Sequence, residues 1–395
     1  MFEHIVIRRA EGGSSISAGR IAEALLYYQK VHLVIDRGTL SGLIRQIGMK
    51  SVLALLRRSE VSAVYCEELL VTKSESVGVT QYHNLVEMTF VGHKSIGKFK
   101  NPQDRLRYEL EREGIPKSDA SNFSRLFFDL VPLRKFSGDY FLKGGIAKAA
   151  KRDLIDVEYA REAFRQAVAI TPGGYLAGDD LKLEVIDTER GMVVFLNIDL
   201  TAINQRREKI DPSIGTLSIA HLLTNILEAR ADLALSSFYG GDFVTSAVTS
   251  SIIQVKHAEL LRRSIINETS LKQFSEIILP DSPCLAEVID SGEQSFDDFL
   301  KLLDRAARFK DWLKSVNPDE GLIKTYMRDV ASEGWIQKLP AKSLRYMFTT
   351  ALGATNPVTS LVSGFADTFL VEKLLAGWRP NHFVMGKLSP FVKGY

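Results

Sequence analysis

The first ninety residues alternate short apolar segments with stretches of helical periodicity, and no other feature of the chain constrains its fold as strongly. Four segments have the composition of buried strands: Ile5–Ile7, Val31–Asp36, Val61–Tyr65 and Leu85–Val91. Between the first two, Ser17 can cap a helix whose apolar residues recur at helix spacing. Strand–helix–strand order predicts a sheet covered by helices, so we expect an α/β region with a mixed sheet.

Most of the remaining chain is predicted to be helical. Asn101-Pro102 combines a cap with proline at the first helical position, and Gly114 stands where that helix should end. One β-hairpin is expected, with strands at Leu181–Ile186 and Met192–Ile198. From Ile214 onward the apolar residues recur at helix spacing. The fold class is therefore α/β, with the N-terminal sheet followed by a mostly helical C-terminal domain.

A chain of 395 residues usually holds two or three domains, and we expect three regions here. Residues 1–100 are expected to form the N-terminal α/β domain. Residues 101–210 are expected to form a basic helical connector and the hairpin, which can complete the N-terminal sheet. Residues 211–395 are expected to form the helical C-terminal domain, including an uncharged hairpin at 346–366.

Composition and the lack of targeting signals favour a cytoplasmic protein. Cys66 and Cys284 are the only cysteines, which argues against a disulfide scaffold and removes cysteine-based zinc motifs. The seven histidines include no His-x-x-x-His pair, so no metal site is predicted, and no motif identifies a cofactor. The N-terminus lacks the apolar run of a secretory signal, and no segment reaches the roughly 18–20 strongly apolar residues of a membrane helix.

Two segments resemble phosphate-handling motifs but lack the residues that the chemistry requires. The segment from Gly13 to Gly19 follows a strand and opens a helix, yet it has neither the spacing nor the lysine of a phosphate loop. Free amides at that helix start can bind an anion weakly, although a plain turn is favoured. Val34–Leu40 resembles the phosphotransfer strand of haloacid dehalogenases, but Ile35 and Arg37 occupy the two positions that need aspartate.

Four titratable residues stand near the ends of predicted strands, where α/β folds often place active sites. They are Asp36, Glu67, Glu68 and His83. If they converge, the chain is a hydrolase or a phosphoryl-handling enzyme, and Cys66 with His83 can form a nucleophile–base pair across neighbouring strands. A small buried cysteine and a strand-end histidine are the commoner explanation of those two residues. No catalytic motif is present, so the enzyme remains an alternative.

The connector at 132–152 combines positive charge with aromatic residues, which suits a nucleic-acid backbone with stacking on exposed bases. The candidate anion-binding residues are Arg134, Lys135, Lys143, Lys148, Lys151 and Arg152. Phe136, Tyr140 and Phe141 alternate with them, and Lys143-Gly144-Gly145 can hold a phosphate at a helix start. The alternative is that the aromatic residues belong to the core and the lysines to a solvated helix face.

Charge is distributed unevenly along the chain, although the net charge is only +2. Residues 94–152 contain fourteen Lys and Arg against seven Asp and Glu, a net charge of +7. Residues 281–304 contain seven acids and one lysine, a net charge of −6. Either the basic segment meets an anionic partner, or the two segments face each other within the fold.

The segment Tyr346–Ala366 contains no charged residue and is rich in small and hydroxyl side chains, with Asn356-Pro357 at its centre. Two short helices meeting there would form a hairpin whose backbones approach closely. Each arm has only about ten residues, against the roughly 20 that span a bilayer, so a buried hairpin is favoured. A membrane-acting effector that inserts this hairpin is the third candidate function.

Two further segments flank this hairpin, namely Leu339–Arg345 and Gly377–Phe383, the second of which reads Gly-Trp-x-Pro-Asn-x-Phe. Together the three segments resemble a module of uncharacterised bacterial proteins. The resemblance covers about a tenth to an eighth of the chain and implies a bacterial origin, but no activity.

The sequence as a whole favours a non-catalytic interaction or regulatory protein. Its basic connector is expected to bind an anionic partner, either a nucleic acid, another polyanion or a phosphate-bearing ligand. A protein partner is also compatible with this interpretation, and membrane contact is the minority alternative.

Overall fold

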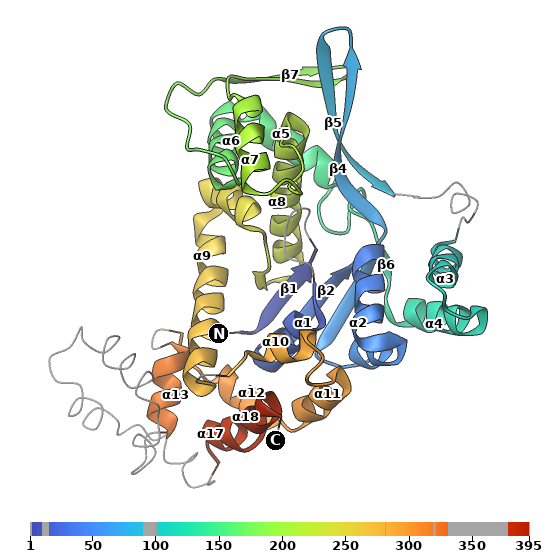
Figure 1. The fold of residues 1–395 in the computed structure, drawn as a ribbon, viewed down its shortest axis with the longest axis vertical. Helices are drawn as coiled ribbons and strands as arrows, with labels where there is room; N and C mark the ends of the chain where they lie inside the picture. Colours follow the sequence, from blue (N-terminus) through green and yellow to red (C-terminus); the bar gives the residue numbers. More distant parts are fainter. Residues whose placement is uncertain are drawn as a thin grey trace, which may run out of the picture.

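The computed structural model describes residues 2–9, 16–89, 99, 101–280, 282–318, 321–330 and 378–394. Within these residues the strands form two sheets (Figure 1). The first sheet is parallel, and its strands in spatial order are β6 (Leu133–Arg134), β3 (Val61–Cys66), β2 (Lys30–Ile35), β1 (His4–Arg8) and β9 (Asp242–Phe243). The second sheet is antiparallel, in the order β4 (Glu68–Val77), β5 (Thr80–Thr89), β8 (Gly191–Leu196) and β7 (Leu183–Thr188).

The parallel sheet arises from the strand–helix alternation of the N-terminal sequence. The helix α1 (Ala18–Tyr27) joins β1 to β2, and α2 (Arg37–Leu56) joins β2 to β3. In register, Ile5 lies beside Val31 and Leu33 lies beside Ala63. Parallel neighbours need such a crossover connection, because the chain must return to the opposite edge of the sheet before the next strand begins.

The strands β4 and β5 do not belong to the parallel sheet. The alternation predicts one mixed sheet in this region, whereas the structure has a parallel and an antiparallel sheet. Only Glu67 separates β3 from β4, and one residue is too short for a crossover to a parallel neighbour. The chain instead forms a long antiparallel hairpin of β4 and β5, with Gly78 at a positive φ of 61° in the turn. Residues 85–89 of the predicted strand Leu85–Val91 form the second half of β5, and Phe90 and Val91 lie outside the described residues.

The predicted hairpin after residue 180 is confirmed as β7 and β8. Gly191 begins β8 at a φ of 140°, a backbone conformation that favours glycine. His83 of β5 lies beside Met192 of β8, so this hairpin extends the β4–β5 sheet. The connector region thus supplies β6 to the parallel sheet and β7 and β8 to the antiparallel one.

Helices account for most of the remaining described residues, as predicted. In the middle of the chain they are α3 (Pro102–Arg112), α4 (Lys117–Leu130), α5 (Ile146–Ile155), α6 (Val157–Ile170), α7 (Leu200–Ile210), α8 (Ile219–Tyr239) and α9 (Ala247–Ile278). The C-terminal ones are α10 (Leu285–Asp290), α11 (Phe296–Asp304), α12 (Ala307–Lys314), α13 (Leu322–Val330), α17 (Pro380–Phe383) and α18 (Ser389–Lys393), with a π-helical turn at Val384–Leu388. The long helix α9 is kinked at His257 and connects the region of α6 to that of α13 (Figure 1).

Each face of the parallel sheet lies against its own hydrophobic core. Because side chains alternate along a strand, Ile5 and Leu33 enter one core, whereas Val6 and Val34 enter the other. The first core also contains α1–α4 and the C-terminal helices α10–α13, and the second contains α5, α6, α8 and the antiparallel sheet. The α/β class and the helical C-terminal region are therefore confirmed.

The segment Tyr346–Ala366 lies outside the described residues, as do Leu339–Arg345 and Gly377. Within the described part of the chain, no helix combines the length and the apolar composition that crossing a bilayer requires. Phe383, the last residue of the Gly377–Phe383 segment, is buried and stacks on Phe309 of α12 with ring centroids 4.9 Å apart.

Candidate functional site

Asp36 and Glu67, two of the predicted strand-end acids, are used to hold helices in place. The Asp36 carboxylate caps α2, because its Oδ1 accepts a hydrogen bond from the amide of Thr39 at 2.6 Å. Glu67 faces Arg105 of α3, which donates to it from both Nε, at 2.9 Å, and a terminal nitrogen. Both carboxylates therefore have local structural partners at the carboxyl edge of the sheet.

Glu68 and His83, the other two candidates, do not come together. Glu68 is buried and accepts hydrogen bonds from the amide and the hydroxyl of Ser137. His83 is buried in the antiparallel sheet, where its Nδ1 lies 2.8 Å from the Oγ of Ser74 on the neighbouring strand. Burial lowers the pKa of His83 and raises the pKa of the Cys66 thiol to about 12. A protonated thiol without a histidine partner is a poor nucleophile.

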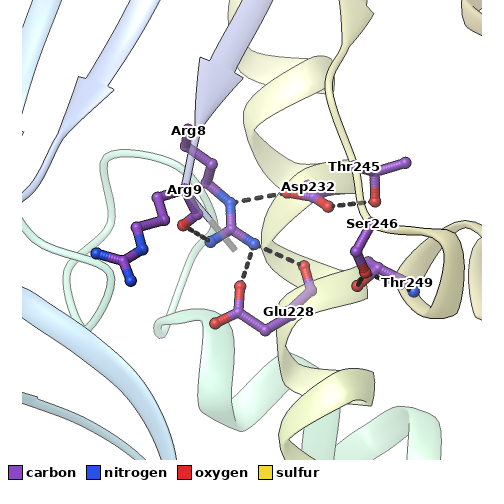
Figure 2. A network of polar contacts seen from close by, with 7 residues as sticks. All are labelled: Arg8, Arg9, Glu228, Asp232, Thr245, Ser246 and Thr249. Atoms are coloured by element: carbon purple, nitrogen blue, oxygen red, sulfur yellow. Dashed lines mark hydrogen bonds and ion pairs between the residues drawn. The ribbon is translucent and has the colours of Figure 1, made fainter. Parts of the chain in front are cut away.

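A buried charge network that the sequence analysis did not identify lies where β1 ends (Figure 2). Arg8 is 5% exposed and forms ion pairs with Glu228 and Asp232, two residues one turn apart on α8. Its Nε donates to Asp232 at 2.7 Å, and its terminal nitrogen also donates to the backbone oxygen of Glu228 at 3.0 Å. Thr245, just after β9, donates to the second oxygen of Asp232 at 2.8 Å. The network joins β1, β9 and α8.

The charges in this network stabilise one another rather than exposing a reactive group. Burial alone would lower the pKa of Arg8, but the attraction of Asp232 and Glu228 outweighs it and raises that pKa. Burial raises the pKa of Asp232 in spite of the nearby guanidinium. In the sequence, the only indication of this network is that Arg8, a charged residue, ends the apolar strand Ile5–Ile7.

The helix start that resembled a phosphate loop is filled by the chain itself. The first amides of α1 donate to side chains from elsewhere: Ala18 to Gln46 and Gly19 to Asp290, both at 2.8 Å. Gly19 also lies so close to α10 that an added Cβ would stand 2.2 Å from the backbone oxygen of Ala286. Glycine at position 19 therefore allows α1 and α10 to pack closely. The Asp290 carboxylate occupies the position at the start of α1 where an anion would bind.

The second expected phosphate position, at the start of α5, is filled in the same way. The amide of Ala147 donates to the Glu87 carboxylate at 2.6 Å, and an added Cβ on Gly145 would stand 3.0 Å from the same oxygen. The amide of Gly144 donates to Asp139 at 2.8 Å. Internal carboxylates thus satisfy these amides, and a phosphate at this helix start would meet a negative charge.

The aromatic residues of the connector divide between the core and the surface. Phe136 and Phe141 are buried in the second hydrophobic core, with ring centroids 5.9 Å apart. Tyr140 is 49% exposed, and the guanidinium of Arg134 lies 3.9 Å from the centre of its ring. The core interpretation therefore holds for the two phenylalanines, and an arginine–tyrosine pair remains at the surface.

Most basic residues of the connector form no ion pair with an acidic residue of the described ranges. Lys151 pairs with Asp187 at 2.8 Å. In the part of the chain that the structure describes, no ion pair engages the remaining four exposed cations, which are Lys135, Lys143, Lys148 and Arg152. We call these four, with Arg134 and Lys151, the α5 basic surface. Lys148 and Arg152 are one turn apart on α5, and the Lys148 side chain lies close to Gly144, the residue after Lys143.

The acidic segment 281–304 does not neutralise this surface. Asp304 forms an ion pair with Arg58 at 2.9 Å, and Asp290 accepts a hydrogen bond from the amide of Gly19 on α1. Among the described residues, no ion pair joins 281–304 to the α5 basic surface. Across the described parts of 94–152 and 281–304, no ion pair joins the two oppositely charged segments. The candidate cations of the connector are exposed or half-buried.

Comparisons of this chain with protein-family models, curated proteins and solved structures found no match. Nor do the described residues contain a group of three His, Cys, Asp or Glu side chains arranged to hold a metal ion.

Proposed function

We propose that this chain is a non-catalytic nucleic-acid-binding protein and that the α5 basic surface contacts the phosphate backbone. The observation that carries the proposal is the group of exposed cations on α5 and in the segment before it, four of which form no ion pair among the described residues. Lysine and arginine that are already neutralised by the protein contribute little to binding a polyanion, whereas unpaired ones release counterions from the nucleic acid.

The pair of Arg134 and Tyr140 at the surface favours single-stranded over double-stranded nucleic acid as the ligand. A tyrosine ring at the surface can stack on an unpaired base, and the adjoining guanidinium adds a charge beside it. In a duplex the bases are stacked on one another and are not available to the ring. The arrangement fits a backbone contact along α5, with one base placed near Tyr140.

Titration of a labelled 20-nucleotide single strand, followed by fluorescence anisotropy at several salt concentrations, tests the proposal. With about four phosphate contacts, the logarithm of the binding constant should fall against the logarithm of salt concentration with a slope of about −3. A duplex of the same length should bind more weakly. Absence of salt-sensitive binding to either nucleic acid contradicts the proposal.

Charge reversal at the surface separates a local contact from an effect of net charge. Lys143→Glu with Lys148→Glu should reduce affinity at low salt by at least about tenfold and flatten the salt slope by about one to two. The matched control is Arg262→Glu with Arg308→Glu, two exposed cations on α9 and α12 that change the net charge equally. Equal weakening by both double variants would remove the α5 basic surface from consideration.

A further inference from the structure

A cavity of about 430 Å³ lies beside the amino-terminal end of the parallel sheet, between α1, α9, β9 and the start of α10. None of its lining residues belongs to the α5 basic surface. Its volume falls within the range of roughly 300–1,000 Å³ that holds small organic ligands. The inner wall includes the buried side chains of Ile5, Tyr28 and Phe243.

The charged groups of the cavity are mostly acidic. Its wall contains five carboxylates and only two cationic side chains, Arg20 and Lys272. The carboxylates are Glu23, Asp242, Glu268, Glu276 and Glu287. Arg20 is already paired with Glu268 at 2.7 Å, which leaves Lys272 at the exposed rim as the cation without an ion pair among the described residues. A ligand that enters this cavity therefore meets an excess of negative charge.

The carboxylates differ in how fully the protein satisfies them. Asp242 is buried and accepts hydrogen bonds from Tyr28 at 2.9 Å, Asn267 at 2.6 Å and Arg263 at 3.1 Å. Those three donors leave little capacity for a ligand. Glu23 accepts one long hydrogen bond of 3.4 Å from the amide of Ala286 and one from the thiol of Cys284, a weak donor. A carboxylate can accept about four hydrogen bonds, so Glu23 has capacity to spare.

We infer that the cavity binds a small organic cation whose primary ammonium group is held by Glu23, beside the rings of Tyr27 and Tyr28. An ammonium donates three hydrogen bonds and suits a half-buried carboxylate that the protein satisfies incompletely. Carboxylates beside tyrosine rings are surroundings in which organic cations bind. A metal ion fits less well, because no three candidate ligands converge within the described residues.

The rim carboxylates favour a ligand with a second cationic group. Glu268 and Glu276 are exposed on α9, whereas Glu23 lies deeper, on α1. A linear diamine can reach from the inner carboxylate to the rim, and its methylene groups would lie along the apolar wall at Leu271 and Leu279. The inference does not depend on the proposed nucleic-acid binding, because the two sites share no residue.

Thermal unfolding of the full chain with putrescine, spermidine, choline or glutarate at constant ionic strength tests the inference. Putrescine and spermidine should raise the melting temperature saturably, choline less so because it lacks ammonium hydrogens, and the dianion glutarate not at all. A second readout is alkylation of Cys284, which lines the cavity, while Cys66 is buried elsewhere. Bound diamine should slow modification of Cys284, identified by mass spectrometry of its peptide.

Glu23→Gln distinguishes a ligand contact from a structural role. Burial raises the pKa of Glu23, so removing its charge should leave the protein at least as stable at pH 7. The variant should nevertheless bind putrescine at least about tenfold more weakly, since a hydrogen bond to a charged group is lost. The rim variant Glu276→Gln should weaken binding less, and Glu259→Gln, on α9 outside the cavity, should not change it.

Two results would overturn the inference. One is that neither diamine nor triamine shifts the melting temperature or protects Cys284. The other is that Glu23→Gln and Glu276→Gln both bind putrescine as tightly as the unaltered chain does, which would mean that the amine binds outside this cavity. Either result leaves the nucleic-acid proposal unaffected, because that proposal is tested on α5.

Discussion

At the residue scale, Arg8 is expected to contribute most to stability among the charged side chains. Arg8→Met would leave the buried carboxylates of Glu228 and Asp232 without their guanidinium, which should lower the free energy of unfolding by roughly 3–5 kcal/mol. The neighbouring Arg9 is exposed, and its side chain points away from the network (Figure 2). Arg9→Met should therefore change stability by less than about 0.5 kcal/mol. Urea denaturation of both variants checks this, and equal losses would contradict it.

His32 should make stability depend on pH. Its ring stacks on Tyr239 with centroids 4.6 Å apart, and burial, followed by the nearby charges of His4 and Lys30, lowers its pKa to about 4. The unfolded chain protonates this histidine near pH 6.5, so it binds more protons than the folded chain between pH 6.5 and 4. The histidine's contribution is therefore complete above pH 6.5 and is lost as the pH falls towards 4.

An NMR titration of the His32 ring measures this directly, and a midpoint near 6.5 would contradict the expectation. The variant His32→Phe keeps an aromatic ring against Tyr239 but cannot take up the proton. It should therefore lose less stability than the unaltered chain between pH 7 and pH 5, as measured by urea denaturation at the two pH values.

Single residues were the hardest features to interpret from the sequence. Asp36, Glu67 and Glu68 follow strands as predicted, yet a capped helix, an arginine on α3 and a serine after β6 engage them. The Asp36 cap is a local contact three positions away, but the partners of Glu67 and Glu68 lie 38 and 69 positions away, and nothing in the local sequence identifies those two. The position of a side chain along a strand is predictable from periodicity, whereas its partner depends on tertiary packing.

At the element scale, the contact between α1 and α10 depends on Gly19. Gly19→Ala would place a Cβ 2.2 Å from the backbone oxygen of Ala286, so the helices must separate. We expect a loss of about 1–3 kcal/mol in the free energy of unfolding. The matched control is Gly42→Ala within α2, where an added Cβ meets nothing within 4 Å. That change should stabilise the helix by about 0.5–1 kcal/mol, because alanine is the better helix former.

Thermal unfolding of the two alanine variants compares these effects. A destabilised Gly19 variant beside a stabilised Gly42 variant would support helix packing as the role of Gly19. A neutral result at Gly19 would mean that α1 and α10 are less closely packed than the structure shows.

Elements whose signals are local were predicted well from the sequence. The helix after Asn101-Pro102 begins at Pro102, with Asn101 as its cap, and the hairpin after residue 180 formed as expected. The long β4–β5 hairpin was only half identified, because polar residues such as Lys73, Ser74 and Glu75 interrupt its apolar pattern. An exposed hairpin arm needs little apolar surface, so its sequence carries a weak strand signal.

At the scale of the whole molecule, the C-terminal helices share a core with the N-terminal sheet. Phe309, Trp312 and Leu33 belong to one hydrophobic cluster. The side chain of Lys310 is also buried, and its Nζ donates to the backbone oxygen of Leu25 at the end of α1 at 2.6 Å. No periodicity in the sequence relates segments almost 300 residues apart, which is why this shared core was not predicted in detail.

A shared core implies that the two ends of the chain unfold together. Phe309 is fully buried between Trp312 and Phe383, and Phe309→Ala should cost about 3–5 kcal/mol through the cavity that it leaves. If the core is one cooperative unit, amide hydrogen exchange in β1–β3 should accelerate as much as exchange in α12. The control Phe195→Ala removes a ring that is 55% exposed and should change exchange little. Faster exchange confined to α12 would show instead that the C-terminal helices open independently of the sheet.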